Sequence, residues 1–201
     1  THHGVMDIGF MRMLPNIVLI SPSDAKEVEL ALKFAISSER SVAIRYPRDK
    51  IAVDDFDRVA CEAEFEIGKS VTVESHDGSE VALVGYGCVL SELLSAAKIL
   101  KGEGIKVDVI NGRVAKPGDE GIIDLLYVGK KLVVVEDHSL SCGFGSAVLE
   151  AAAARNKKID KNGITLVNVG DEFIRHDLRS SQLKQAGINA EELAEKVKRL
   201  L

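Results

Sequence analysis

The chain has 201 residues, of which 46% are hydrophobic and 28% are charged, and its formal net charge is −5. This composition supplies enough apolar surface for a folded core and excludes global disorder. The acidity lies in residues 51–80, which hold 2 Lys and Arg against 9 Asp and Glu, whereas residues 1–50 hold 7 against 6 and residues 81–201 hold 17 against 16. Neither end offers the basic face that a nucleic-acid partner needs, so we expect no such partner.

The sequence also disfavours a membrane or secreted protein and a protein built on disulfides or on cysteine metal sites. No apolar run approaches the roughly 18 to 20 residues of a membrane helix, and the N-terminus lacks the layout of a secretory leader, so we expect no membrane contact. The three cysteines, Cys61, Cys88 and Cys142, fit neither a disulfide framework nor paired metal ligands. We therefore expect reduced thiols in a cytoplasmic protein. The start at Thr1 rather than Met suggests processing or a cut from a longer chain.

The first predicted elements are a strand, a helix and a second strand. An apolar run at 16–20 is followed by Ser-Pro-Ser-Asp, after which apolar residues recur at helical spacing up to Ala35. Asp24 and Glu27 have the three-residue spacing of a capping box, which predicts a helix start. The short apolar run at 42–44 predicts the second strand. Such a unit is too small to fold alone.

The rest of the chain changes character twice. Residues 49–80 read as an acidic, extended connector, in which the alternation at 71–73 suggests a short hairpin and Asp77-Gly78 marks a turn. From Val81 strands and helices alternate to the end, which predicts a three-layer α/β domain with an open, mostly parallel sheet. The expected strands are 81–86, 105–110, 132–136 and 164–168, and the expected helices are near 91–101, 119–127, 145–155 and 190–200.

Ligands of open parallel sheets bind beyond the carboxyl ends of the strands, and two candidate sites come from the first 50 residues. His2 and His3 could donate a proton or a hydrogen bond to a substrate oxygen, or they could belong to a tag remnant or an ordinary loop. Arg45 and Arg48 flank a Tyr-Pro pair after a strand and could clamp a phosphate or a carboxylate. The alternative for the two arginines is a set of surface salt bridges.

A third candidate lies in residues 136–146. Glu136, Asp137 and His138 follow a strand, and glycines near Cys142 precede a helix N-terminus whose free N–H groups could hold an anion. The segment lacks a nucleophile elbow and a phosphate-binding loop. A structural use is therefore favoured over an acid, base and thiol set.

A fourth candidate is the Gly-Tyr-Gly sequence at 85–87, which resembles the start of a dinucleotide-binding fingerprint. Leu90 stands where the third glycine belongs, and Asp108 follows at about 20 residues only by coincidence. Nucleotide binding is therefore disfavoured.

Four segments, in this order, resemble one family. They are THHGVMDIGFMRMLPNIVLISPSD (1–24), AIRYPR (43–48), VDVINGRVAKPGDE (107–120) and CGFGSAVLE (142–150). Together they are similar to the C-terminal part of the 1-deoxy-D-xylulose-5-phosphate synthase family of transketolase-like enzymes. The resemblance implies that residues 1–50 end a pyrimidine-binding α/β domain, that 51–80 form a linker, and that 81–201 form a transketolase C-terminal domain.

The resemblance also implies an activity. Enzymes of this family use thiamine diphosphate and Mg²⁺ to decarboxylate pyruvate and to join the two-carbon remainder to D-glyceraldehyde 3-phosphate. The product, 1-deoxy-D-xylulose 5-phosphate, is a precursor of isoprenoids, thiamine and pyridoxal. A cytoplasmic homodimer is the implied assembly.

Few site residues carry over from the family. The histidine after threonine in the family's Thr-His-(His or Gln)-Gly motif lies beside the reacting centre and maps to His2. The second arginine of the RYPR motif contacts the acceptor phosphate and maps to Arg48, whereas Arg45 receives no catalytic role. Asp49 stands where the family usually has glycine. The metal and diphosphate motif and the activating glutamate lie upstream of Thr1, so this chain alone should bind no cofactor and be inactive.

Three other interpretations remain open at the level of sequence. The chain could be the C-terminal half of a split transketolase-like protein that uses another ketose donor. It could be a noncatalytic module that contributes dimer contacts. It could also be a nucleotide-binding domain that uses Gly85 and Gly87.

Overall fold

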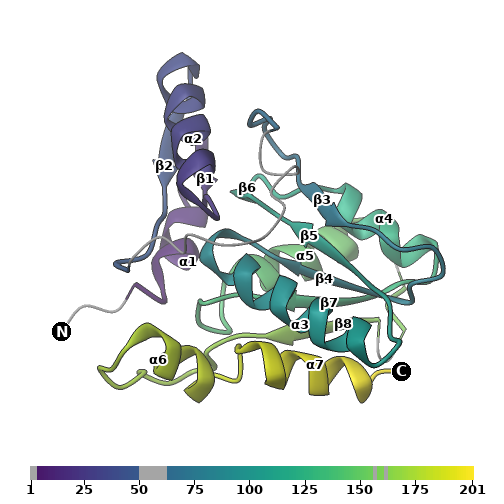
Figure 1. Ribbon diagram of the computed structural model, residues 1–201. Helices are drawn as coiled ribbons and strands as arrows, with labels where there is room; N and C mark the ends of the chain where they lie inside the picture. Colours follow the sequence, from purple (N-terminus) through teal and green to yellow (C-terminus); the bar gives the residue numbers. More distant parts are fainter. Residues whose placement is uncertain (1–3, 50–62, 156–157, 161–162) are drawn as a thin grey trace.

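The computed structural model describes residues 4–49, 63–155, 158–160 and 163–201 (Figure 1). We call the first four elements the N-terminal unit: α1 (Asp7–Arg12), β1 (Ile17–Ile20), α2 (Ala25–Ser37) and β2 (Ser41–Ile44). The later elements form the C-terminal domain: β3 (Val71–Glu74), β4 (Val81–Gly85), the short 3-10 helix η2 (Gly87–Val89), α3 (Leu90–Gly102), β5 (Val107–Asn111), β6 (Val114–Lys116), α4 (Gly121–Tyr127), β7 (Lys131–Val135), α5 (Phe144–Ala154), β8 (Ile164–Val167), α6 (Arg179–Gln185) and α7 (Ala190–Lys198).

The C-terminal domain is built on a five-stranded sheet with the order β3-β5-β4-β7-β8. β4, β5, β7 and β8 run parallel, because helices connect them and return the chain to the same edge. β3 runs antiparallel to β5 at the edge. The predicted α/β fold with an open, mostly parallel sheet is therefore confirmed.

The hairpin suggested for residues 71–73 is not formed with the next strand. β4 already pairs with β5 on one side and β7 on the other, so it has no free edge for β3. β3 instead crosses to the free edge of β5, where Val71 lies opposite Asn111. The predicted turn at Asp77-Gly78 is present, and its glycine has a φ of +77°, a conformation that side chains disfavour.

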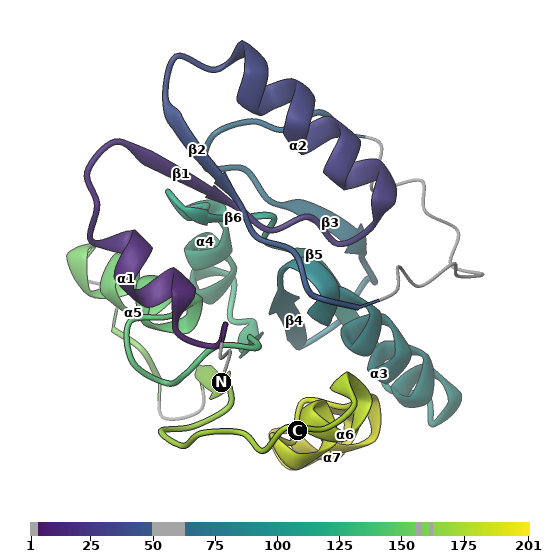
Figure 2. The same ribbon diagram turned by 90° about the vertical axis from the view of Figure 1, so that its left-hand side faces the viewer.

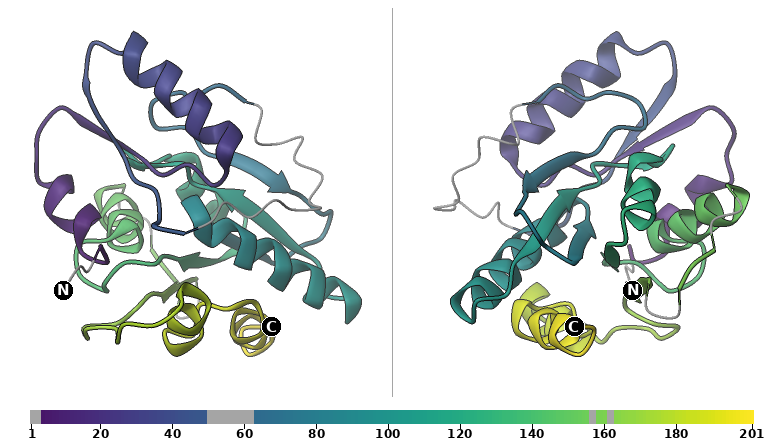
Figure 3. Two further views of the ribbon diagram at one scale, coloured as in Figure 1. Left: turned by 60° about the vertical axis from the view of Figure 1, so that its left-hand side comes forward. Right: turned by 90° about the vertical axis from the view of Figure 1, so that its right-hand side faces the viewer.

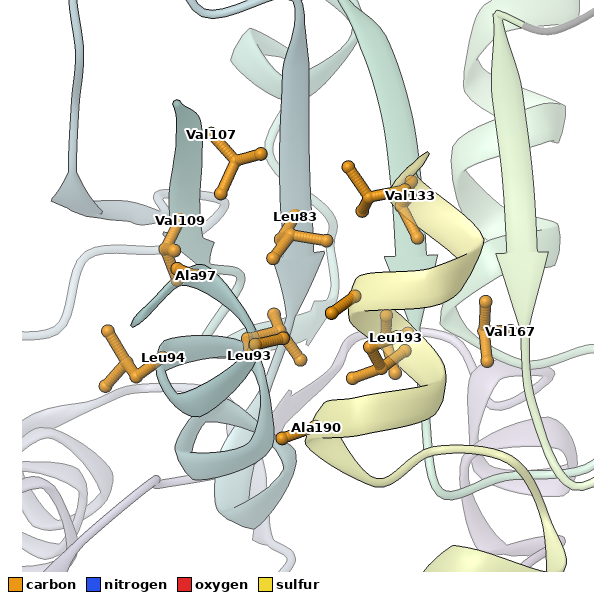
Figure 4. Packing of buried hydrophobic residues seen from close by; sticks show 14 of the residues in the cluster. Leu83, Leu93, Leu94, Ala97, Val107, Val109, Val133, Val167, Ala190 and Leu193 are labelled. Carbon is orange, nitrogen blue, oxygen red and sulfur yellow. The ribbon is translucent and has the colours of Figure 1, made fainter. Parts of the chain in front are cut away.

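Helices cover both faces of this sheet and make the three layers. α3 and α7 pack on one face, where apolar side chains alternate inward from the strands (Figure 4). α4 and α5 pack on the other face. All five residues of β4 are buried, which explains why this strand has an uninterrupted apolar sequence.

The N-terminal unit has its own small sheet, completed by a strand from the C-terminal domain. β1 lies between β2, to which it is parallel, and β6, to which it is antiparallel. α2 lies over this sheet, and α1 lies beside α5 (Figure 2). The small core beneath α2 includes Val18, Ile20 and Leu30 together with Val114 of β6. In both views of Figure 3, α2 and α7 are at opposite sides of the molecule.

The start of α2 is fixed by the capping box that the sequence predicts. Asp24 Oδ1 accepts a hydrogen bond from the Glu27 N–H at 2.8 Å. The Glu27 carboxylate also turns back, and it accepts hydrogen bonds from the N–H and the hydroxyl of Ser23 at 2.7 and 2.8 Å. One of the unpaired N–H groups at the start of the helix, that of Glu27, is therefore satisfied by the cap.

Glu27 also makes a buried ion pair with the C-terminal domain. Its side chain is 0% exposed, and its Oε1 lies 2.7 Å from Nε of Arg113, which is 2% exposed. Arg113 donates further hydrogen bonds to the carbonyl oxygens of Glu64 and Ala63, and its guanidinium lies 3.8 Å from the ring centroid of Phe65. The pair joins α2 to the segment between β5 and β6.

In the part of the chain that the structure describes, no helix combines the length and the apolar character needed to cross a bilayer.

Arg113→Ala should lower the free energy of unfolding by about 3–5 kcal/mol, because it leaves the Glu27 carboxylate buried without an opposite charge, with only neutral hydrogen-bond donors around it. Arg155→Ala is the matched control, since Arg155 pairs with Asp124 at 2.9 Å on the surface and should cost about 0–1 kcal/mol. Urea denaturation measures both values. If both variants lost equally little unfolding free energy, the buried pair would not hold the N-terminal unit to the C-terminal domain.

Candidate functional site

Charged side chains gather at the carboxyl end of the five-stranded sheet, around Asp137, which follows β7. Its Oδ1 accepts a hydrogen bond from Arg45 Nη1 at 2.7 Å, and its Oδ2 accepts one from Arg179 Nη2 at 3.1 Å. Arg45 Nε donates in turn to Asp7 Oδ2 at 2.7 Å. We call Asp7, Arg45, Asp137 and Arg179 the ionic clasp. It ties α1 and the end of β2 to β7 and α6.

The environment keeps the clasp charged. Burial by itself would raise the pKa of Asp137, but the charges of Arg45 and Arg179 outweigh burial and hold that pKa below its usual value. Burial would lower the pKa of Arg45, but Asp137 above all raises it. Because the folded-state pKa of Asp137 is depressed, its contribution to stability is present above its unfolded pKa of about 3.9 and is lost as pH falls through the folded value.

A thiol lies against the clasp. Cys88 Sγ is 2.6 Å from Arg179 Nη2 and 3.5 Å from Asp137 Oδ2. Burial, with a further contribution from the Asp137 carboxylate, raises the pKa of this thiol to about 12. Cys88 is therefore a protonated, unreactive thiol at neutral pH.

The two arginines of the RYPR segment have different surroundings. Arg45 has a half-buried side chain that is bound to two carboxylates. Arg48 is exposed, and among the described residues it makes no hydrogen bond or ion pair. Asp49, which follows it, is also exposed. His2 and His3 lie outside the described residues. The geometry therefore makes Arg45 part of the clasp and leaves the Arg48 guanidinium open to an anion.

The candidate at 136–146 has a structural role. The Glu136 carboxylate accepts hydrogen bonds from the N–H groups of Phe144 and Gly145 at 2.7 and 3.0 Å, so it occupies the N-terminus of α5. Burial raises the pKa of Glu136, although these two backbone hydrogen bonds oppose the shift. A Cβ at Gly143 would lie 2.3 Å from Glu136 Oε2, so a side chain there would displace the carboxylate from the helix end. No room is left for a bound anion at this helix end.

His138 serves to hold α1. Its ring is buried, and its Nε2 accepts a hydrogen bond from the N–H of Gly9 at 3.0 Å. Its Nδ1 lies 2.9 Å from the carbonyl oxygen of Ser139, which assigns the proton to Nδ1. Both ring nitrogens are thus engaged by the backbone.

The glycines at 85–87 do not form a nucleotide site. Gly87 has a φ of +59°, and a Cβ there would lie 2.3 Å from Ser21 Oγ, so the loop after β1 fills the space above the N-terminal end of α3. Asp108 lies near the start of β5, at the other end of the sheet from Gly85, and it pairs with Lys130. The elements of the apparent fingerprint are therefore far apart.

A cleft of about 170 Å³ adjoins the clasp. Its lining combines charged and polar side chains of the clasp and α6 with apolar ones. The lining residues are Gly4, Val5, Arg45, Asp137, Val169, Ile174, Arg179, Gln182, Leu183 and Ala186. Among the residues that the structure describes, no group of three or more His, Cys, Asp or Glu could hold a metal ion.

Comparison with known families assigns both parts of the chain. The model of the transketolase C-terminal domain matches residues 68–193, and that of the transketolase pyrimidine-binding domain matches residues 1–53. The chain belongs to the transketolase family. The N-terminal unit is accordingly part of a pyrimidine-binding domain, and the five-stranded sheet is that of a transketolase C-terminal domain.

Curated relatives share the whole length of the chain. The 1-deoxy-D-xylulose-5-phosphate synthase of Rhodopirellula baltica is 35% identical over 97% of the chain, and that of Thermus thermophilus is 37% identical over 95%. The chain spans only 29% of each of these two relatives. The resemblance to this family is thereby confirmed for the C-terminal region.

Solved structures show the same fold. A split-gene transketolase, described as an inactive β4 tetramer, superposes with a TM-score of 0.80 at 26% identity, over all of this chain and 63% of the other. A transketolase mutant from Pichia stipitis superposes with a TM-score of 0.68 at 20% identity, over 99% of this chain and 27% of the other.

Iodoacetamide at pH 8 should alkylate the exposed Cys142 at least about 100-fold faster than Cys88, because a pKa near 12 leaves only about one Cys88 in ten thousand as thiolate. Peptide mapping by mass spectrometry gives the two rates. The Cys88 rate should keep rising about tenfold per pH unit above pH 8. In guanidinium chloride the difference should disappear, and equal rates in the folded protein would contradict the assignment.

Proposed function

We propose that this chain is the C-terminal portion of a 1-deoxy-D-xylulose-5-phosphate synthase. The complete enzyme condenses pyruvate with D-glyceraldehyde 3-phosphate with loss of CO₂, a transferase reaction that feeds isoprenoid, thiamine and pyridoxal synthesis. The observation that carries the proposal is the 35–37% identity to synthases of this name along almost the entire chain. Its natural setting is a cytoplasmic homodimer.

In this proposal the chain supplies two site residues. His2 hydrogen-bonds the substrate or the reaction intermediate, and Arg48 binds the phosphate of the acceptor sugar. The exposure of Arg48 and its lack of a partner among the described residues support this role, since a guanidinium already bound to a carboxylate could not bind phosphate without losing that bond. Asp49 next to it places a negative charge near the phosphate, which should weaken the binding.

Thiamine diphosphate and Mg²⁺ belong, in this proposal, to the portion of the complete enzyme that lies outside this chain. Thiamine diphosphate supplies carbanion stabilisation when it is bound. The part assigned to this chain in the proposal is substrate binding and the shaping of the site. The division into residues 1–50, 51–80 and 81–201 is part of the same proposal.

A second candidate is the C-terminal half of a split transketolase that uses another ketose donor. The observation that favours it is the superposition on the split-gene transketolase, which covers all of this chain. The two candidates differ in the donor, because the synthase releases CO₂ from pyruvate and a transketolase does not.

The isolated chain should show no Mg²⁺-dependent binding of thiamine diphosphate in a calorimetric titration. Mixing it with the N-terminal portion of the enzyme should restore release of CO₂ from pyruvate. Turnover of a ketose phosphate without CO₂ release would favour the split transketolase instead. Tight binding of the cofactor by the chain alone, or no activity of either kind in the mixture, would overturn the proposal.

In the complete enzyme, Arg48→Ala should raise the KM for D-glyceraldehyde 3-phosphate by about 10- to 100-fold, because one charge-assisted contact to phosphate contributes about 1.5–3 kcal/mol. The rate of pyruvate decarboxylation should change less than about twofold, since a substitution that weakens only acceptor binding does not affect this step. Arg40→Ala is the control, because Arg40 is also exposed but precedes β2. If the acceptor KM were unchanged, Arg48 would not contact the phosphate.

A further inference from the structure

The turn after β7 binds four different parts of the protein through four consecutive residues, which we call the 136–139 turn. Glu136 holds the N-terminus of α5, and Asp137 binds Arg45 and Arg179. The next two residues hold the chain around α1: His138 Nε2 accepts the N–H of Gly9 at 3.0 Å, and the N–H of Ser139 donates to the carbonyl oxygen of Val5 at 2.7 Å.

Two of these parts carry the proposed site residues. Residues 5–9 follow His2 and His3 with only Gly4 between them. Arg45 precedes Arg48 by three residues, and Pro47 between them fixes one φ angle and restricts the residue before it. A shift of Arg45 is therefore passed on to the backbone that carries Arg48.

Arg45 connects the two parts to each other as well as to the turn. One edge of its guanidinium donates from Nε to Asp7, in the first turn of α1, while Nη1 and Nη2 donate to Oδ1 and the carbonyl oxygen of Asp137 at 2.7 and 3.3 Å. Asp7 is itself oriented, because its Oδ1 accepts the N–H of Ile8 at 2.9 Å. A planar fork bound on both sides has one orientation, which a lysine could not reproduce.

We propose that Asp137 is a positioning residue that, through Arg45, fixes the Arg48 loop relative to residues 5–9. Without its carboxylate, Arg45 keeps its ion pair with Asp7 and its 3.3 Å bond to the backbone carbonyl oxygen of residue 137, but both Arg45 and Arg179 lose their ion pair to the turn. The acceptor-phosphate part of this inference rests on the proposed function, whereas the fixing of the two segments does not.

A second aspartate of the chain, Asp108, offers a matched control that separates a positioning role from a general loss of stability. Asp108 is a similarly buried aspartate that pairs with Lys130 and accepts hydrogen bonds from Ser79 Oγ at 2.7 Å and the His76 N–H at 2.9 Å. It lies near the start of β5, at the opposite end of the sheet. Asp108→Asn therefore removes a comparable charge from the same domain without touching the 136–139 turn.

Hydrogen exchange of the 201-residue chain tests the positioning directly. Asp137→Asn should speed exchange at least about fivefold in peptides that cover residues 4–13 and 41–49, whereas peptides from α3 and α7 stay within about twofold. Asp108→Asn should not produce this local pattern. Unchanged exchange at 4–13 and 41–49, or equal acceleration everywhere, would overturn the proposal.

Kinetics of the complete enzyme test the consequence for Arg48. Asp137→Asn should raise the KM for D-glyceraldehyde 3-phosphate about tenfold and that for pyruvate less than about twofold, and Arg45→Lys should give an intermediate value. In an Arg48→Ala background, Asp137→Asn should add nothing further, because it acts through Arg48. Additive effects would show that it does not. If the unmodified enzyme did not use this acceptor, the proposed function would fail, while hydrogen exchange would still decide the positioning of the two segments.

Discussion

A carboxylate and a guanidinium that are almost inaccessible to solvent, those of Glu27 and Arg113, meet where α2 approaches the C-terminal domain. Neither charge could remain in this interior alone, because an unpaired buried ion loses its hydration without compensation. The N-terminal unit must therefore dock in the one position that pairs them. Arg113 accepts a φ of +47° in this position, which indicates that the surrounding contacts outweigh the local backbone preference.

The N-terminal unit is thus held at two places with different chemistry. At one, a buried pair and the apolar residues beneath α2 join it to the segment around β6. At the other, the ionic clasp joins it to the carboxyl end of the five-stranded sheet, where parallel sheets offer their binding sites. The first place determines that the two parts stay together, and the second orients the segments that carry the proposed site residues.

The elements that the sequence predicts well are those with a local signal. The buried strands have continuous apolar runs, α7 has a strong amphipathic pattern, and the start of α2 has its capping box. The sequence does not predict α1, β6 and α6, because they are six, three and seven residues long, too short to establish a period. The ionic clasp cannot be derived from the sequence either, because Arg45 and Asp137 lie 92 residues apart and an ion pair between distant residues produces no recognisable pattern. No motif in the sequence marks Asp7 or Arg179, whereas the RYPR segment and residues 136–138 are recognisable by their composition.

The pairing of β1 with β6 has a consequence for synthesis on the ribosome. The edge of β1 that pairs with β6 is made 96 residues before Lys116 completes its partner, since β1 ends at Ile20. At about 5–20 residues per second, translation leaves this edge without its native partner for about 5 to 20 s. An open strand edge can pair with other chains during that interval, so the nascent protein is exposed to misassembly through this edge while residues 21–116 are being made.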